Sequence, residues 1–306
     1  MSAAHSKDVT IPLTITGTAT IDTDYSTTFT GKNIVSLIAG GNGEGSDLNQ
    51  FDNPRDVYLD NSNNVYVSDI SNNRVIKWTL DSSEGEEVIS GINSPWGIYI
   101  DGSKNIYVAS YTDHAVYKYI NSSGSYTQTT IAGGNGQGSE LNQLSYPTGI
   151  HVDSAGNVYV ADRNNHRIVK WAPNATQGEL VAGGNGEGSD LNQLNNPYGL
   201  TADSSGNIYI ADNSNSRIMK WSQDASEGIY VVYSREVREV HINDSKDIYA
   251  LSYRHNVYKH TLTSDGYSTS TIMGNGSAGS SLNQLNRPQG FYVMILIIFM
   301  SLIIQS

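Results

Sequence analysis

The feature that most constrains the fold of this chain is an internal repeat. Two clean copies are "PTGIHVDSAGNVYVADRNNHRIVKW" from Pro147 and "PYGLTADSSGNIYIADNSNSRIMKW" from Pro197. A repeat of about 40–50 residues is typical of solenoids and propellers, in which each copy buries its apolar face against the next. The repeats lie near residues 54–90, 95–133, 147–183, 197–233 and 237–273, with a partial copy at 288–293.

Each repeat has the pattern of four short strands. In the third copy these are "GIHVD", "NVYVAD", "RIVKW" and "GELVAG", in which β-branched and aromatic residues dominate. Asp153 and Gly156 lie between the first two strands, where an Asp can bond to nearby backbone and a Gly can take a positive φ. The pattern predicts an all-β fold, a β-propeller with four-stranded antiparallel blades.

The number of repeats predicts a six-bladed propeller whose last blade is incomplete. A glycine-rich loop precedes units 1, 3, 4 and 6 but is missing before units 2 and 5, which also resemble each other, so we infer a duplicated block of three blades. The segment "KNIVSLIAGG" at residues 32–41 resembles a fourth strand, and we expect it to close the ring with the partial copy at 288–293.

The two ends of the chain do not match the repeat. The expected domains are a Thr-rich segment at 1–31, the propeller at 32–293 and an apolar tail at 294–306. Residues 9–30 could supply substitute strands or belong to an upstream region. The tail is too short for an ordinary transmembrane helix, and we interpret it as a truncated gene end, with a lipid-anchor signal as the alternative.

The glycine-rich loop "GGNGEGSDLNQF" from Gly40 invites comparison with phosphate-binding loops. Ser46 and Asp47 stand where a P-loop has Lys and Ser or Thr, and no helix follows. We therefore predict a structural connector that crosses a blade, about 14 Å wide for three strand spacings, with Leu48 and Phe51 as anchors.

The string "P-x-G-[IL]-x-V-D-x-x-G-N-[IV]-Y-V-A-D-x-x-N-x-R-[IV]-x-K-W" resembles the NHL repeat, most clearly at 147–171 and 197–221 and well at 54–78. This resemblance implies a propeller, commonly six-bladed. Related domains are protein- or RNA-binding platforms, receptor or sensor domains, and occasionally enzymes such as the peptide-amidating lyase. The resemblance therefore implies the fold more strongly than the function.

The net charge and the absence of cysteine limit the classes of partner and site that the chain can have. A net charge of −12 argues against nucleic acid, because phosphate binding needs a basic face, and zero Cys excludes disulfides and thiolate metal sites. We expect a monomer that binds a protein or peptide, with a membrane role only if the tail is an anchor. The localisation stays open: no signal peptide is apparent, and four sequons weakly allow an extracellular form.

One face of the propeller should carry both the connectors and the loops between second and third strands, and we choose this connector face for binding. Asp69, Asp162 and Asp212 recur five residues before an Arg, which indicates a loop tether paired with that Arg; a ring of Arg heads for an acidic ligand is the alternative. The candidate binding residues are Asp69, Arg74, Asp162, His166, Arg167, Asp212, Arg217, Glu44, Asp47, Glu187 and Asp190.

His151 and His241 occupy the same place in two first strands, which should line the central channel. They are weak candidates for a divalent metal site because no third ligand is evident, and no other cofactor is expected.

The acidic residues follow the repeats rather than forming one asymmetric pair, so no catalytic residue is assigned. We expect a non-catalytic binding scaffold. The alternatives are a metal-dependent enzyme of the propeller lyase type with its site in the channel, and an RNA-binding domain.

Overall fold

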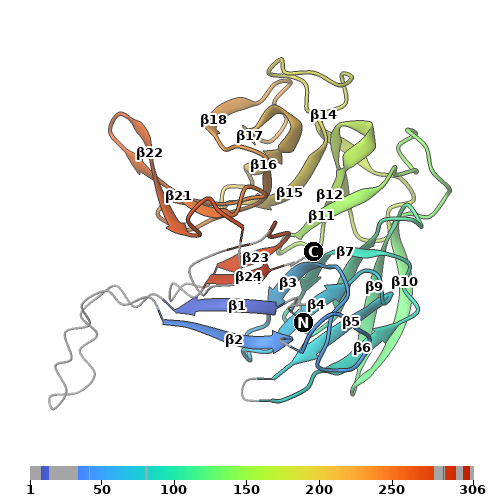
Figure 1. Cartoon of the computed structure of the whole chain (residues 1–306). Helices are drawn as coiled ribbons and strands as arrows, with labels where there is room; N and C mark the ends of the chain where they lie inside the picture. The colour runs from blue at the N-terminus through green and yellow to red at the C-terminus, as the bar shows by residue number, and fades with distance from the viewer. Residues whose placement is uncertain are drawn as a thin grey trace, which may run out of the picture.

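The computed structural model describes residues 8–13, 34–40, 42–79, 82–278, 285, 287–293 and 299–303. The chain is an all-β propeller, with antiparallel four-stranded blades arranged around a central axis (Figure 1). Within each blade the first strand lies nearest the axis and the fourth lies at the outside. This architecture and the NHL-type strand pattern agree with the prediction from the repeat.

Five blades are each formed by four strands consecutive in sequence. The first consists of β3 (Pro54–Leu59), β4 (Val65–Asp69), β5 (Arg74–Trp78) and β6 (Glu86–Ser90). The second consists of β7 (Pro95–Ile100), β8 (Ile106–Ser110), β9 (Ala115–Ser122) and β10 (Ser125–Gly133). The third consists of β11 (Pro147–Val152), β12 (Val158–Asp162), β13 (Arg167–Trp171) and β14 (Glu179–Gly183).

The fourth blade consists of β15 (Pro197–Ala202), β16 (Ile208–Asp212), β17 (Arg217–Trp221) and β18 (Ile229–Tyr233). The fifth consists of β19 (Val237–Ile242), β20 (Ile248–Ser252), β21 (Asn256–Thr263) and β22 (Gly266–Met273). Short 3-10 turns, η1 (Arg163–Asn165) and η2 (Asn213–Asn215), join the second and third strands of blades 3 and 4.

The repeats form five blades and not the six that we expected, because the partial sixth copy supplies one short strand only. A further sheet combines both ends of the chain in the order β2 (Ile34–Gly40), β1 (Asp8–Leu13), β24 (Phe299–Ile303) and β23 (Phe291–Val293). Strand β23 contacts both β3 and β19, so this sheet lies between blades 1 and 5. Two of its strands come from the segments that we placed outside the propeller.

The glycine-rich connectors are held together by their own side chains. In the loop after β10, Gly133, Gly134 and Gly136 all take a positive φ, between 65° and 80°. Gln143 donates a hydrogen bond from Nε2 to the carbonyl oxygen of Asn135, at 3.1 Å. Asn135 in turn donates from Nδ2 to the carbonyl oxygen of Asn142, at 2.9 Å. These bonds account for the repeated Gly, Asn and Gln, and support the structural interpretation.

The blades pack through aliphatic and aromatic side chains of their inner and middle strands. Trp78, Trp171 and Trp221 are almost fully buried, as expected of core residues. Phe51 is completely buried and anchors its connector, but Leu48 is 38% exposed, so the expectation that both residues anchor the loop was wrong for Leu48. Leu48 lies in a turn of the connector, and its backbone carbonyl oxygen accepts a hydrogen bond from the backbone N–H of Gly85 at 2.9 Å.

Blades 2 and 5 share a feature that the other described blades lack. Their outer hairpins, β9–β10 and β21–β22, are formed by strands of eight or nine residues, whereas the outer strands of blades 1, 3 and 4 have five. The β21–β22 hairpin projects from the ring in Figure 1. The shared extension agrees with the predicted kinship of units 2 and 5.

Candidate functional site in the central channel

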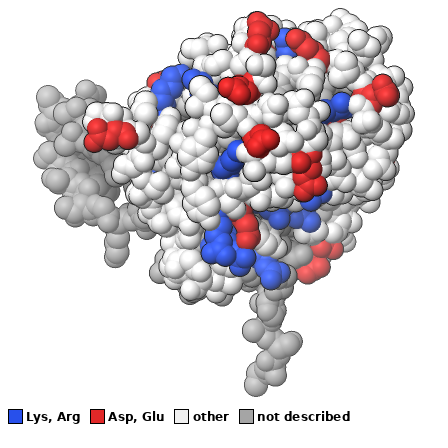
Figure 2. Space-filling model, turned by 90° about the horizontal axis from the view of Figure 1, so that it is seen from above, with Lys and Arg blue, Asp and Glu red and all other residues white. Residues whose placement is uncertain are grey.

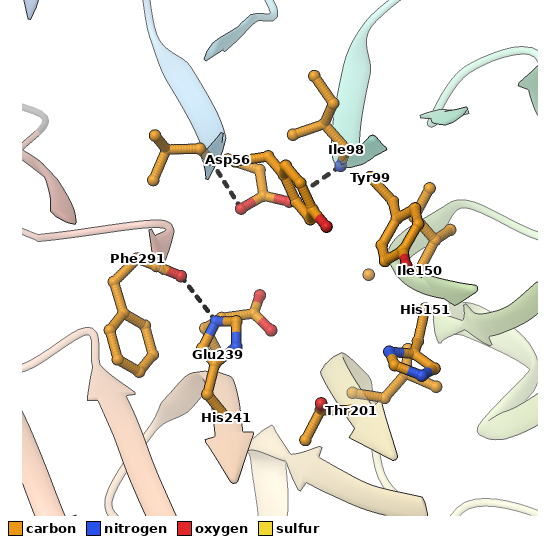
Figure 3. Close-up of a pocket in the computed structure, with 13 residues that line it drawn as sticks. Asp56, Ile98, Tyr99, Ile150, His151, Thr201, Glu239, His241 and Phe291 are labelled. Atoms are coloured by element: carbon orange, nitrogen blue, oxygen red, sulfur yellow. Dashed lines mark hydrogen bonds between the residues drawn. The ribbon is translucent and has the colours of Figure 1, made fainter. Parts of the chain in front are cut away.

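A cavity of about 240 Å³ lies at the centre of the propeller, where the first strands of the blades meet. Its walls come from β3, β7, β11, β15, β19 and β23 (Figure 3). Both carboxyl groups among its lining residues, those of Asp56 and Glu239, belong to blades on either side of β23. The cavity therefore combines an enclosed space with acidic groups, which is a frequent arrangement in binding and catalytic sites.

Asp56 and Glu239 occupy one position of the repeat, two residues after the start of the first strand. The other copies have glycine at this position, namely Gly97, Gly149, Gly199 and Gly290. These glycines let neighbouring first strands approach closely: a Cβ on Gly149 would lie 2.8 Å from the Cα of Gly199. The repeat thus builds a narrow ring of backbone and inserts a carboxyl group in only two places.

The Asp56 carboxyl group bridges blades 1 and 2. Its Oδ1 accepts a hydrogen bond from the backbone N–H of Val57 at 2.8 Å, and its Oδ2 accepts one from Ile98 at 2.9 Å (Figure 3). Burial raises the pKa of Asp56 to about 7, although these two hydrogen bonds act in the opposite direction. Near neutral pH this group can therefore either accept or give up a proton.

Ser68 helps to position Asp56. The backbone N–H of Asp56 donates to Ser68 Oγ at 2.9 Å, and Ser68 Oγ donates to the carbonyl oxygen of Trp96 at 2.6 Å. The corresponding residues in blades 2, 3 and 4 are alanines, so blade 1 alone among these has a hydroxyl group here. The substitution of Ala by Ser accompanies the substitution of Gly by Asp.

Glu239 lies against Gly199 of the neighbouring blade, and the backbone N–H of Val240 donates to its Oε1 at 3.3 Å. Burial raises the pKa of Glu239 well above its ordinary value, and the nearby charge of Asp56 raises it further. The two carboxyl groups are electrostatically coupled, so we treat them as a pair that shares protons. The charge of Asp56 favours the protonated form of Glu239.

His151 and His241 line the same cavity, as the sequence predicted for these positions. Burial lowers the pKa of each to about 4, so both are neutral at neutral pH. His241 Nε2 lies 2.8 Å from the carbonyl oxygen of Phe291 and joins blade 5 to β23. Figure 3 shows the two rings on different walls of the cavity, with Thr201 between them.

The donor set does not fit a metal ion. Within the part of the chain that the structure describes, no three His, Asp or Glu side chains are grouped closely enough to hold one. The weak candidate pair His151 and His241 gains no third ligand here, and metal sites in proteins usually have three or four. We therefore derive no chemical step through a metal.

Arginine and aromatic side chains surround the entrance of the channel on the connector face. They come from the position directly before Asp56 and Glu239 in the repeat and from the loops between second and third strands. We call this group the Arg–aromatic mouth; it consists of Arg55, Trp96, Tyr111, Arg163, Tyr198, Arg238 and Tyr253. Arg55, Trp96, Tyr198 and Arg238 also share a small cavity with Asp56 and Glu239, so the mouth is continuous with the carboxyl pair.

The charged groups predicted on the connector face form a loop scaffold. Asp162 is fully buried, and its Oδ2 accepts hydrogen bonds from Arg167 Nε at 2.7 Å and from Asn165 Nδ2 at 2.8 Å. Its Oδ1 accepts from the backbone N–H of Ser145, at 2.6 Å. The Arg167 guanidinium also donates to carbonyl oxygens of the connector. The predicted tether is present, and equivalent pairs are Asp69 with Arg74 and Asp212 with Arg217.

The other predicted binding residues lie on the connectors. His166 is half-buried, and its Nδ1 accepts a hydrogen bond from the backbone N–H of Asn196 at 3.1 Å. The exposed carboxylates are Glu44, Asp47, Glu187 and Asp190. Glu187 accepts a hydrogen bond from Asn195, at 3.0 Å. These residues lie away from the cavity lining, and ligand binding by them stays a prediction.

The cavity residues that the sequence interpretation did not single out are Asp56, Glu239 and the two arginines before them. The expectation that no asymmetric acidic pair exists was wrong. The signal was present in "PRDVYL" and "VREVHI", where the same Arg-acidic dipeptide replaces the x-Gly of other copies. Repeats draw attention to what recurs, whereas a single active site is built from what departs from the repeat.

A second cavity, of about 440 Å³, lies farther out between blades 3 and 4. Asp153, Lys170 and Glu179 line it, and Lys170 pairs with Glu179 at 3.3 Å. Hydrogen bonds, chiefly from Asn157, lower the pKa of Asp153 in spite of partial burial. Lys170 and Glu179 pair with each other here, whereas the central cavity holds two carboxyl groups with raised pKa values, so we place the candidate site in the channel.

The outer surface carries charges of both signs. Figure 2 shows one side of the molecule on which basic and acidic side chains alternate without an extended basic field. In the described ranges no helix has the length and apolar character needed to cross a membrane.

The NHL repeat model matches residues 144–171 and 194–221. No curated protein sequence matches the chain. A solved protein of unknown function from Bacteroides thetaiotaomicron aligns with 96% of this chain and 76% of its own, with a TM-score of 0.65 and 17% identity. A gluconolactonase from Xanthomonas campestris aligns over 82% and 86%, with a TM-score of 0.60 and 9% identity.

Virginiamycin B lyase from Staphylococcus aureus aligns over 85% of this chain and 97% of its own, with a TM-score of 0.55 and 12% identity. At such identities the likeness shows the fold alone. Sequence match and strand topology agree on the repeat unit and on the arrangement of the blades. The chain is therefore a β-propeller that carries NHL repeats.

Proposed function

We propose that the protein is an enzyme that acts by proton transfer on a small molecule in the central channel. The observation that carries this proposal is the pair Asp56 and Glu239. The two residues replace glycine in only two copies of the repeat, line one cavity and have raised pKa values. Carboxyl groups with separated, elevated pKa values are the usual acid and base of enzymes that work near neutral pH.

The charge of Asp56 raises the pKa of Glu239 beyond the effect of burial, and this asymmetry suggests the roles. In this proposal Asp56, with a pKa of about 7, is the general base, and Glu239 is the general acid. In a hydrolysis, Asp56 takes a proton from a water molecule while the oxygen of that water attacks the acyl carbon. Glu239 gives its proton to the leaving oxygen. In an elimination, Asp56 takes the proton from carbon and Glu239 protonates the leaving group.

The similar structures support an enzyme more than a scaffold. Two of them are named for a lactonase and a lyase activity, and both share the propeller architecture. Each of these reaction classes needs one base and one acid, which is what the channel supplies. In this proposal the sheet of β2, β1, β24 and β23 is the sixth wall of the channel and brings Phe291 to the cavity.

A binding role is the second candidate. The Arg–aromatic mouth opens on the connector face that the sequence singled out for binding, and arginines and aromatic rings are enriched at recognition sites. In that case a ligand is held at the mouth with no turnover. RNA binding is not favoured by any contact in the described residues and stays an untested prediction.

The test is a pH–rate profile with gluconolactone, small aromatic lactones and quinupristin, with which an inactive virginiamycin B lyase was solved, as first substrates. We expect the rate to rise as the pH passes about 7 and Asp56 ionises. Asp56→Asn and Glu239→Gln should each lower kcat/KM by about 10²–10⁴-fold. Asp153→Asn, in a turn outside the channel, is the control and should leave kcat/KM unchanged. A substrate that is turned over equally by both channel variants would contradict the assignment, and ¹⁸O-water would separate hydrolysis from elimination.

A further inference from the structure

The side chains above the carboxyl pair have a chemistry of their own. Arg55 and Arg238 flank the channel entrance in blades 1 and 5, the same two blades that carry Asp56 and Glu239. The Arg55 guanidinium carbon lies 4.5 Å from the ring centre of Trp96. That of Arg238 lies 4.1 Å from the ring centre of Tyr198 and 4.6 Å from that of Tyr253. The aromatic rings thus hold the flat faces of both guanidinium groups.

The edges of the two guanidinium groups lack partners. Nε of Arg55 and Nε of Arg238 are buried and have no hydrogen-bond partner, and neither side chain has a carboxylate within salt-bridge distance in the described ranges. Stacking uses the face of a guanidinium and leaves its in-plane N–H groups available. A buried N–H without a partner is costly, so a hydrogen-bond acceptor bound at this place would stabilise the two side chains.

The two cations also lie close enough to affect each other. Burial, together with the charge of Arg238, lowers the pKa of Arg55 to about 10. Holding two positive charges together in a partly buried site is unfavourable unless an anion neutralises them. A planar guanidinium matches a carboxylate or phosphate through two parallel hydrogen bonds. Arg163, which lies over Tyr198 at 5.0 Å, adds a third cation to the same cluster.

We propose that the Arg–aromatic mouth recognises an organic oxyanion, and that the substrate of the channel therefore carries a carboxylate or phosphate group. Arg55 and Arg238 bind this group, and the remainder of the molecule reaches down to Asp56 and Glu239. The position of the reacting bond rests on the proposed function, whereas binding of the anion does not. The scaffold residues Asp69, Asp162 and Asp212 take no part, since their partners are satisfied within the loops.

The experiment measures binding of three probes to the full chain by calorimetry or NMR: benzoate, phenyl phosphate and the neutral isostere benzamide. We expect saturable binding of at least one anion below about 10 mM, and benzamide at least about tenfold weaker. Tighter binding of phenyl phosphate would assign the phosphate class, and tighter binding of benzoate the carboxylate class. Equal binding of benzamide, or no saturable binding of either anion, would overturn the proposal.

Variants locate the site. Arg238→Gln and Arg55→Gln should each weaken binding of the tighter-binding anion by about tenfold or more. Arg238→Lys should weaken it less, because lysine keeps the positive charge but lacks the two parallel N–H donors of a guanidinium. Arg254→Gln is the matched control: this exposed arginine pairs with Glu236 at 2.7 Å outside the mouth. Unchanged affinity in both mouth variants, with native thermal melts, would refute the site.

A last pair of variants separates this inference from the proposed function. Asp56→Asn and Glu239→Gln should not weaken anion binding, because removing a negative charge from the cavity shared with Arg55 and Arg238 favours a bound anion. Anion binding without turnover of any substrate would support anion recognition by the Arg–aromatic mouth and contradict the proposed enzymatic function. Turnover that depends on Asp56 but not on Arg55 or Arg238 would support the enzymatic function and contradict anion recognition by the mouth.

Discussion

The carboxyl group of Glu239 fills the space beside Gly199 on the neighbouring blade. A Cβ on Gly199 would collide with both carboxyl oxygens of Glu239, which is half-buried on the cavity wall. The glycine of one repeat copy and the acid of the next are therefore complementary. The duplicated position of the repeat serves packing in blade 4 and chemistry in blade 5.

This relationship predicts the effect of Gly199→Ala. The added methyl group should displace the carboxyl end of Glu239 at a cost below about 1 kcal/mol, because the atoms that it meets are the far end of a flexible side chain on the cavity wall. The double variant with Glu239→Gly should recover most of that loss in urea unfolding. Gly102→Ala, where a Cβ meets nothing within 4 Å, is the control and should be close to neutral. Additive effects of the two changes would contradict the collision.

A second prediction concerns the pH dependence of stability. The pKa of Asp56 is raised from an ordinary value of 3.8 to about 7, so between these values the folded state binds more protons than the unfolded state. The contribution of Asp56 to stability is then fully present below pH 3.8 and is lost as the pH rises through 7. Asp56→Asn should remove this loss and stabilise the protein at pH 8 by roughly 1–3 kcal/mol, after allowance for partial solvent screening.

The measurement is Tm as a function of pH for the wild type and Asp56→Asn. The difference between the two curves should grow from pH 4 to pH 8. A gain in stability combined with a loss of activity is the pattern expected of a functional group held in an unfavourable environment. A constant difference across this range would show that Asp56 ionises normally in the folded protein.

The third prediction concerns the channel histidines, whose effect on the pH dependence of stability is opposite to that of Asp56. Burial lowers the pKa of His241 from 6.5 to about 4, so the unfolded state binds a proton first as the pH falls. Stability from this group is fully present above pH 6.5 and is lost as the pH falls through 4. His241→Gln, which keeps a donor for Phe291, should reduce acid destabilisation by roughly 1–3 kcal/mol at pH 4. Chemical denaturation at pH 4 and 7.5 tests this, and parallel losses in both proteins would refute it.

The sequence was sufficient for the architecture of each blade, although not for the number of blades, because the repeat encodes a blade locally. The turn "DSAGN", the strand "NVYVAD" and the Gly, Asn and Gln of each connector are satisfied by contacts within one or two blades. The buried pair of Asp162 and Arg167 was predicted for the same reason, since its partners lie within the repeat and the connector before it.

The sequence predicted that residues 32–41 and 288–293 would close the ring, and β2 and β23 do share one sheet, but its two middle strands and the site could not be obtained in this way. Strand β1 pairs with β24, and this pairing joins the two ends of the chain by contacts that no local pattern encodes. Asp56 and Glu239 are far apart in sequence, and only the circular arrangement brings them to one cavity. Their raised pKa values arise from burial in the channel, which is a property of the assembled ring and not of either segment.

The last prediction concerns the scaffold of the connector face. Asp162 is fully buried and joins Arg167, Asn165 and the backbone of Ser145. Asp162→Ala should destabilise the protein by about 3–5 kcal/mol, because it leaves the Arg167 guanidinium buried without its counter-ion. The double variant Asp162→Ala/Arg167→Ala should cost less than the sum of the single changes, since both lose the same pair. Anion binding at the Arg–aromatic mouth, measured on the folded fraction, should be retained; its loss with an unchanged melting temperature would instead make Asp162 a ligand contact.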